Sequence, residues 1–182
     1  QFDGAVYYLP YGNGLFIKNP WGLDDPPGFG TLIPLIIADL NRDATNEICL
    51  GLGSDALLGG VFIRNRFGLL LAQPSLGTQM SLVTGMAAAD LDEDNNLELA
   101  VVGADENDEL GVWVLDFDGS IVPGWPQKLG LSSSNWISGY PAIGDLNNDG
   151  KLEIVITVFS IDEARVYVWQ QDGSPILNNS SW

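Results

Sequence analysis

Short apolar runs alternate with short polar turns along the whole chain. Three runs of mostly small apolar residues each end on an aspartate, and a second apolar run follows each of them after a polar stretch. Because these runs are short and apolar at successive positions, they predict β-strands that are buried on both faces. The first runs cover 35–39, 86–90 and 141–145, and the second cover 47–50, 97–102 and 152–156. No segment has a convincing helical period.

A third kind of run is rich in β-branched and aromatic residues and alternates with polar positions, which is typical of a half-buried strand. It occurs at 5–8, 60–63, 111–114 and 165–168. A glycine-containing turn follows each copy, and the Asp-Gly pairs among these turns favour hairpins. A fourth short run then completes the pattern at 15–18, 69–72, 120–122 and 174–177. Pro175 inside the last of these suits an edge strand.

Two independent anchors show that the pattern repeats. The aspartates Asp39, Asp90 and Asp145 are 51 and 55 residues apart. The central valines of the third run, Val6, Val61, Val112 and Val166, are 55, 51 and 54 residues apart. A repeat of about 50 residues with four antiparallel strands has the size of a β-propeller blade. We therefore predict an all-β fold, a β-propeller of four-stranded antiparallel blades.

The blade count predicted from these anchors is about three and a half. The chain is interpreted as a single propeller region over 1–182, with half a blade and then three blades at 1–20, 32–73, 86–126 and 140–177. Propellers have about four to eight blades, and an exposed sheet edge or face is a liability. We expect a partial propeller that the remaining blades or another chain complete. The first residue is Gln1 rather than Met, which we interpret as a processed chain or a piece of a longer one.

The polar stretches between the first and second runs have the composition of loops around a hard cation. Oxygen-bearing side chains occupy positions 1, 3, 5 and 9 of nine, and position 7 can add a backbone carbonyl, which suits Ca²⁺. We expect up to three Ca²⁺ ions. The predicted ligands are Asp39, Asn41, Asp43, Thr45 and Glu47 in the first loop, Asp90, Asp92, Asp94, Asn96 and Glu98 in the second, and Asp145, Asn147, Asp149, Lys151 and Glu153 in the third.

Position 6 of each loop must turn sharply, and we expect a positive φ there. Gly150 suits such a turn and Asn95 tolerates it, whereas Ala44 carries a steric cost. Arg42 also lies inside the first loop, so we rank that loop weakest and leave the order of the other two open. An EF-hand would need a glutamate at position 12, where the sequence has Leu50, Val101 and Ile156. Acidic turns that bind nothing remain the alternative.

The composition of the chain limits the kinds of partner that it is expected to bind. The formal charge of −17 argues against nucleic acid and against an anionic membrane surface, since both are bound by clusters of Lys and Arg. There is no histidine, and no apolar run is long enough to span a membrane. Cys49 is the only cysteine and lies in an apolar run, which predicts a small buried side chain.

The segment 145–156 and its two counterparts resemble the FG-GAP/VCBS repeat family, which is found in integrin α-subunits and in bacterial secreted proteins. The shared pattern is Asp-x-Asp/Asn-x-Asp-Gly-x-x-Asp/Glu before an apolar strand, and the run 101–104 and the pair Phe29-Gly30 match further parts of the repeat. Ala44 departs from it at position 6, and position 9 is Glu rather than Asp in all three loops. The resemblance implies a seven-bladed propeller, Ca²⁺ in the loops and an extracellular setting, either secreted or at the cell surface.

These expectations favour a non-enzymatic, calcium-binding module for adhesion, with structural Ca²⁺ and a protein or carbohydrate ligand on the rim opposite the loops. Candidate contacts there are Trp21, Phe29, Trp136 and Tyr140, which could instead fill gaps between blades. One alternative is a structural element of a larger surface assembly. Another is part of a secreted polysaccharide-active enzyme, catalytic or not, which would rest on carboxylates, Tyr or Lys. Asn178 and Asn179 begin overlapping glycosylation sequons.

Overall fold

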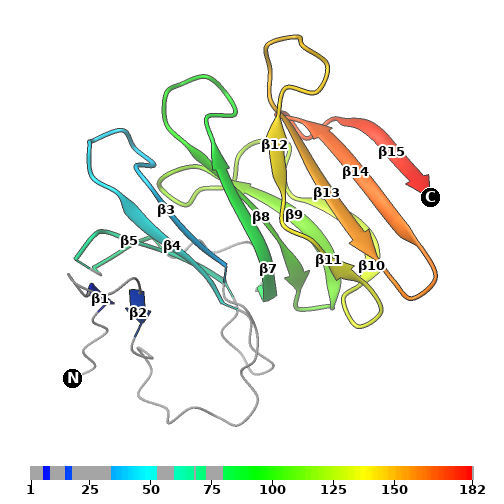
Figure 1. Ribbon diagram of the computed structural model, residues 1–182, viewed down its shortest axis with the longest axis horizontal. Helices are drawn as coiled ribbons and strands as arrows, with labels where there is room; N and C mark the ends of the chain where they lie inside the picture. Colours follow the sequence, from blue (N-terminus) through cyan, green and yellow to red (C-terminus); the bar gives the residue numbers. More distant parts are fainter. Residues whose placement is uncertain are drawn as a thin grey trace, which may run out of the picture.

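The protein is built from antiparallel sheets that lie side by side (Figure 1). The computed structural model describes residues 6–8, 15–17, 34–52, 60–67, 69–72 and 80–181. Within these ranges every regular element is a β-strand, and no helix is long and apolar enough to cross a membrane. The all-β prediction is confirmed.

Three larger sheets follow the two-stranded pair of β1 (Val6–Tyr8) and β2 (Leu15–Ile17). The first sheet has the order β3-β4-β5-β6, the second β10-β9-β8-β7, and the third β11-β13-β14-β15 with β12 also paired to β13. Their strands are β3 (Leu35–Ala38), β4 (Glu47–Leu52), β5 (Gly60–Arg64), β6 (Leu70–Ala72), β7 (Met80–Ala89), β8 (Glu98–Asp105), β9 (Glu109–Leu115), β10 (Gln127–Ser132), β11 (Ile137–Ser138), β12 (Ala142–Gly144), β13 (Glu153–Phe159), β14 (Ala164–Gln170) and β15 (Pro175–Ser181).

Alternation along the central strands explains how the sheets stack. Successive side chains of a strand point to opposite faces, so an apolar run supplies both faces of its sheet. On β8, Leu99 and Val101 join Cys49 and Ile63 of the first sheet in one core cluster. The intervening Ala100 and Val102 join a second cluster with the third sheet, together with Ile154, Ile156 and Trp169. Each of these two sheet-to-sheet interfaces therefore buries one face from each neighbour.

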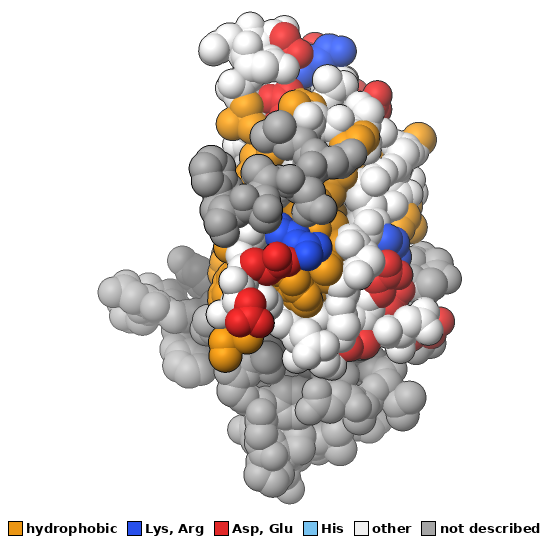
Figure 2. Space-filling view, turned by 90° about the vertical axis from the view of Figure 1, so that its right-hand side faces the viewer, with side chains coloured by type: hydrophobic (Ala, Val, Ile, Leu, Met, Phe, Trp, Pro, Cys, Tyr) orange, Lys and Arg blue, Asp and Glu red, His pale blue; other side chains and the backbone are white. Residues whose placement is uncertain are grey.

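The far face of the third sheet is more open. Ala100, Val102 and Ala104 of β8 are fully buried, but the residues 55 positions later on β13 are not. Val155 is partly buried, Thr157 is exposed and Phe159 is 44% exposed. Figure 2, which looks onto the side of the molecule where the third sheet lies, shows hydrophobic side chains in the middle of that side. No further described sheet covers this face.

The fourth strand of the second sheet is not where the sequence pattern placed it. Ile121 of the predicted run 120–122 forms only an isolated bridge with Leu115, and the strand that pairs with β9 is β10. The chain first touches β9 through Val122 N–H and Val114 C=O, at 2.9 Å, and turns at Gly124, where φ is 93°. It then returns to β9 at residue 127, so the apolar run marks only the start of the edge contact.

The same error affects stretches to which the sequence pattern assigned no strand. Residues 127–139 contain β10 and β11, and β7 begins at Met80, before the predicted run at 86–90. Other predictions for the described residues are confirmed. Cys49 is fully buried, and β15 begins at Pro175 on a sheet edge. The tryptophans Trp113, Trp125 and Trp169 are also buried. Residues 18–33, with Trp21 and Phe29, lie outside the described residues.

Candidate functional site

The three predicted cation loops lie at the same edge of the molecule (Figure 1). The first loop (residues 39–47) connects β3 to β4, the second (90–98) connects β7 to β8, and the third (145–153) connects β12 to β13. In each case one strand of the hairpin ends just before the first aspartate, and the next strand begins at the final glutamate. Position 12 falls within β4, β8 or β13, which confirms that these are not EF-hands.

One set of hydrogen bonds recurs in all three loops. The glutamate at position 9 is buried and accepts from the backbone N–H at position 2: Leu40 to Glu47 at 2.9 Å, Leu91 to Glu98 at 2.6 Å and Leu146 to Glu153 at 2.7 Å. The aspartate at position 1 accepts from the N–H at position 6, and the aspartate at position 5 accepts from the N–H at position 7. The carboxylates therefore hold the backbone in a common loop shape.

The backbone of each loop enters the left-handed region twice. At position 6, φ is 68° at Ala44, 77° at Asn95 and 89° at Gly150, which confirms the expected turn. Position 4 also has a positive φ, between 56° and 65°, at Arg42, Glu93 and Asn148. The turn at position 4 could not be predicted from the residue types, because only asparagine among these three residues tolerates such a φ readily.

The second loop brings its carboxylates together. Asp90, Asp92 and Glu98 each offer a carboxylate oxygen, and these three oxygens lie within 4.8 Å of one another. Among the described residues this is the one group of three acidic side chains so arranged. Asp94 lies apart from the group and is held by Asn96, whose backbone N–H and side-chain amide donate to it at 2.7 and 3.0 Å.

One oxygen of the second loop has no partner. Oδ1 of Asp90 is buried and accepts no hydrogen bond. Its counterparts do: Oδ1 of Asp39 accepts from the N–H of Asp43 at 3.0 Å, and Oδ1 of Asp145 accepts from the N–H of Asp149 at 3.2 Å. A buried carboxylate oxygen without a donor is unfavourable unless a cation or another donor meets it.

In the first and third loops, side chains of the loop itself donate further hydrogen bonds to the carboxylates. In the first, the Thr45 hydroxyl and the Asn41 amide both donate to Asp43. In the third, the Asn147 amide donates to Asp149 at 3.0 Å and to Glu153 at 3.4 Å. The three carboxylates of either loop do not form a close group like that of the second loop.

Arg42 has a partner that the sequence did not indicate. Its Nε donates to the carbonyl oxygen of Asn95 at 2.9 Å, so a cationic side chain of the first loop is bound to the backbone of the second. The sequence suggested only that Arg42 weakens its own loop. Its hydrogen bond instead links two neighbouring hairpins.

A family model described as an FG-GAP-like repeat matches residues 90–156. The chain contains an FG-GAP-like repeat. The match begins at the first aspartate of the second loop and ends in β13, just after the third loop. Neither a search of curated proteins nor a search of solved structures gave a match.

The matched residues thus include β8, β9 and β10 of the second sheet and the second and third loops, whereas β7 precedes them. The first loop lies outside the matched residues but has the same hydrogen bonds at positions 2, 6 and 7. Its shared local structure agrees with the repeat seen in the sequence.

Electrostatics distinguish the acidic residues of the three loops. Burial raises the pKa of Glu98 to about 7, and the neighbouring charges of Asp92 and Asp94 add to the effect, although the Leu91 N–H opposes it. Burial also raises the pKa of Glu47. Hydrogen bonds lower the pKa of Asp43, chiefly from Thr45, and that of Asp149, chiefly from the Lys151 N–H. A divalent cation beside Glu98 would favour its charged form.

The donors of the second loop fit such a cation. They are hard carboxylate oxygens on a short loop, one is buried without a partner, and their mutual repulsion needs a positive charge. Asp90, Asp92 and Glu98 would hold the ion, with Asp94 and the Asn96 carbonyl as the remaining predicted ligands.

The opposite edge of the molecule has a second candidate site. Trp136 is partly exposed there and lines a hollow. Tyr140, which follows shortly after it in the sequence, is 57% exposed. The other wall of the hollow is the 160–163 connection, which joins the ends of β13 and β14 farthest from the third loop.

Proposed function

We propose that this chain is a calcium-stabilised segment of a β-propeller that serves as a non-catalytic binding module. The loops at one edge would bind Ca²⁺ and stiffen the hairpins, and the opposite edge would bind a protein or a glycan. The FG-GAP-like repeat supports the propeller, and the recurring loop structure supports a common cation chemistry.

The observation that carries the calcium proposal is the unpartnered Oδ1 of Asp90 beside Asp92 and Glu98. We propose the second loop as the main site, with the third and first loops as weaker ones. Exposed loops of this kind suit extracellular calcium, because modules that work there bind with Kd values of about 10⁻⁴ to 10⁻³ M. A secreted or cell-surface location is part of the proposal.

The open face of the third sheet supports a propeller with further blades. Val155, Thr157 and Phe159 occupy positions whose counterparts on β8 are covered by the next sheet. Remaining blades, or another chain, would cover this face in the same way. This also leaves room for the alternative that the chain is chiefly a structural element of a larger assembly.

An enzymatic role in polysaccharide degradation is the weaker alternative. The chain has no histidine, so catalysis would rest on carboxylates, Tyr or Lys. The acidic group found in the described residues belongs to the second loop. An activity screen on polysaccharides, with any turnover abolished by a single carboxylate variant outside the loops, would favour this alternative.

A calorimetric calcium titration of the EDTA-treated chain tests the proposal. We expect saturable binding, and at least a tenfold loss of affinity at the tightest site in Asp92→Asn. Glu93→Gln is the matched control, since Glu93 is exposed in the same loop at a position that is not a ligand. No heat of binding in the unaltered chain, or equal affinity in both variants, would refute the calcium site.

A further inference from the structure

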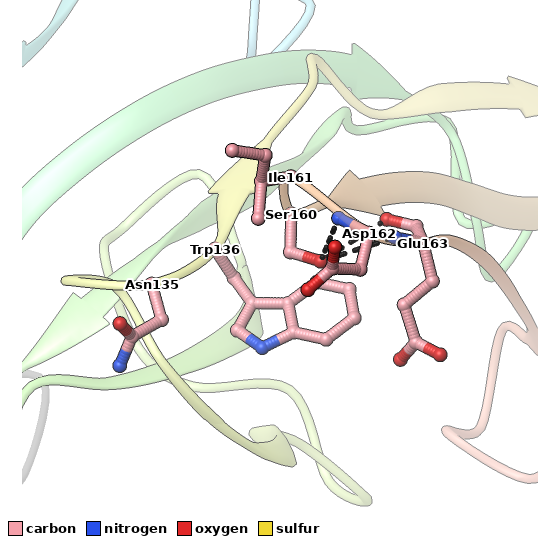
Figure 3. A pocket seen from close by; sticks show the side chains of 6 residues that line it. All are labelled: Asn135, Trp136, Ser160, Ile161, Asp162 and Glu163. Carbon is pink, nitrogen blue, oxygen red and sulfur yellow. Dashed lines mark hydrogen bonds between the residues drawn. The ribbon is translucent and has the colours of Figure 1, made fainter.

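The hollow at the edge opposite the loops is formed by two turns that come from different parts of the chain. Asn135 and Trp136 belong to the turn between β10 and β11, and residues 160–163 form the connection from β13 to β14. Figure 3 shows the indole of Trp136 in the middle, with Asn135 on one side and Glu163 on the other. The hollow has a volume of about 480 Å³, which is within the range of small-molecule sites.

Both turns are held by internal hydrogen bonds. The N–H groups of Asp162 and Glu163 donate to the Ser160 hydroxyl at 3.3 and 3.2 Å, and the Ser160 N–H donates to the Glu163 carbonyl at 2.8 Å. On the other side, the N–H groups of Asn135 and Trp136 donate to the Ser132 carbonyl at 3.1 and 3.0 Å. The walls are therefore organised before any ligand arrives, which lowers the entropy cost of binding.

Asp108 fixes the β10–β11 turn from outside the hollow. Its carboxylate accepts hydrogen bonds from the hydroxyls of Ser132, Ser133 and Ser134. These bonds lower the pKa of Asp108 to about 2. The turn that carries Asn135 and Trp136 is thus anchored to the β8–β9 turn of the same sheet.

The charges of Arg165 and Glu163 beside Trp136 are paired with each other, whereas the carboxylate of Asp162 in the same hollow is unpaired within the described part of the chain. The guanidinium carbon of Arg165 lies 4.6 Å from the centroid of the indole ring, and Arg165 Nε donates to Glu163 at 2.7 Å. A cationic ligand would meet Arg165 at the place where it would seek the aromatic ring. An anionic ligand would meet Asp162 and the strongly negative chain. The indole of Trp136 therefore favours a ligand group without net charge.

Two polar side chains of the lining remain available for a ligand. The amide of Asn135 and the carboxylate of Asp162 have no hydrogen-bond partner among the described residues, and both side chains are exposed. Together they offer donors and acceptors beside the apolar surfaces of Trp136 and Ile161, and Ile161 is 98% exposed. This combination suits a molecule that has both C–H faces and hydroxyl groups.

We infer that this hollow binds an uncharged carbohydrate, with a sugar ring against Trp136 and its hydroxyl groups hydrogen-bonded to Asn135 and Asp162. The inference rests on the proposed binding function of this edge and names its ligand class. Partner proteins that present a charged side chain to the indole fit less well, because Arg165 already lies over the ring and is paired with Glu163.

An array of uncharged oligosaccharides, printed beside sialylated and sulfated forms of the same glycans, tests the inference with the full chain in calcium buffer. We expect binding to a subset of the uncharged glycans and weaker binding to their charged forms. Calorimetry with the strongest of these glycans should show at least a tenfold loss of affinity in Asp162→Asn and in Asn135→Ala. Both residues are exposed, so neither change should disturb folding.

Two control variants lie away from the hollow. Phe67→Ala removes an aromatic side chain that is 74% exposed near the first sheet, and Glu106→Gln removes an exposed charge from the β8–β9 turn. Both should bind like the unaltered chain. Binding to no glycan, binding to charged glycans alone, or unchanged affinity in both hollow variants would overturn the inference. Selection of a charged peptide from a random library, lost in Tyr140→Ser but kept in Asp162→Asn, would overturn it while leaving the proposed binding module intact.

Discussion

The second loop, residues 90–98, and the first loop, residues 39–47, have the same backbone shape but differ in the hydrogen bonds that their carboxylates accept. Both have a buried glutamate that accepts from position 2 and a positive φ at positions 4 and 6. In the first loop, Oδ1 of Asp39 accepts an internal hydrogen bond, whereas the equivalent oxygen of Asp90 is buried without one. Loops of the same backbone shape can therefore either donate hydrogen bonds to their own carboxylates or leave a buried carboxylate oxygen that needs a cation.

The largest expected effect comes from the buried glutamate of the second loop. Glu98→Ala leaves the Leu91 N–H without its partner and removes a proposed ligand, so we expect a loss of about 3 kcal/mol in the free energy of unfolding in calcium buffer. Urea denaturation measures it. Glu93→Ala in the same loop should change stability by less than about 0.5 kcal/mol. A similar small change for Glu98→Ala would mean that its hydrogen bond does not hold the loop.

The stabilisation by calcium should depend on the second loop more than on the first. A cation at a hundred times its Kd stabilises the folded state by about 2.7 kcal/mol, which raises the melting temperature relative to EDTA. We expect Asp90→Asn to abolish most of this rise and Asp39→Asn to keep most of it. Thermal unfolding with and without EDTA gives the comparison, and equal losses in the two variants would remove the distinction between the loops.

A smaller effect should follow from backbone strain in the first loop. Ala44 has a φ of 68°, where a side chain with a Cβ is disfavoured and glycine is not. Ala44→Gly should therefore stabilise the chain by about 1 kcal/mol. Asn95→Gly at the same position of the second loop should give only a few tenths, because asparagine tolerates this conformation. Denaturation that shows destabilisation by Ala44→Gly would contradict the assignment of strain.

The smallest predicted effect concerns the bond between the two loops. Arg42→Ala removes the donor to the Asn95 carbonyl, which lies at the exposed surface, so stability should fall by less than about 0.5 kcal/mol. Arg42 is also a positive charge held against the second loop. Its removal should raise calcium affinity there about twofold, and calorimetry against Arg66→Ala as a control would reveal a change in the wrong direction.

The sequence predicted the loops better than it predicted the sheet edges. The positive φ predicted at position 6 is found at Gly150, and the strands predicted after each loop glutamate are present. Both predictions rest on local signals, namely the spacing of oxygen-bearing residues and the apolar runs. The edge strand β10 was missed since Ile121 and Val122 formed a plausible apolar run, while the pairing of residue 127 with Val112 depends on a bend around Gly124. The Arg42 to Asn95 bond joins residues 53 positions apart and has no local signal.

The candidate site shows the same limit. The spacing of oxygen-bearing residues predicted Asp90, Asp92 and Glu98 as ligands. Only the fold shows that their oxygens lie close together and that one of them lacks a hydrogen-bond donor. Similarly, Trp136 could be named as an exposed aromatic, whereas the hollow around it requires two turns from separate strands to meet.

The most direct test is an anomalous diffraction map from crystals of the chain grown in calcium. The account predicts its strongest peak among the oxygens of Asp90, Asp92 and Glu98, with a weaker peak or none in the first loop. A strong peak in the first loop together with none between Asp90 and Glu98 would contradict the central claim.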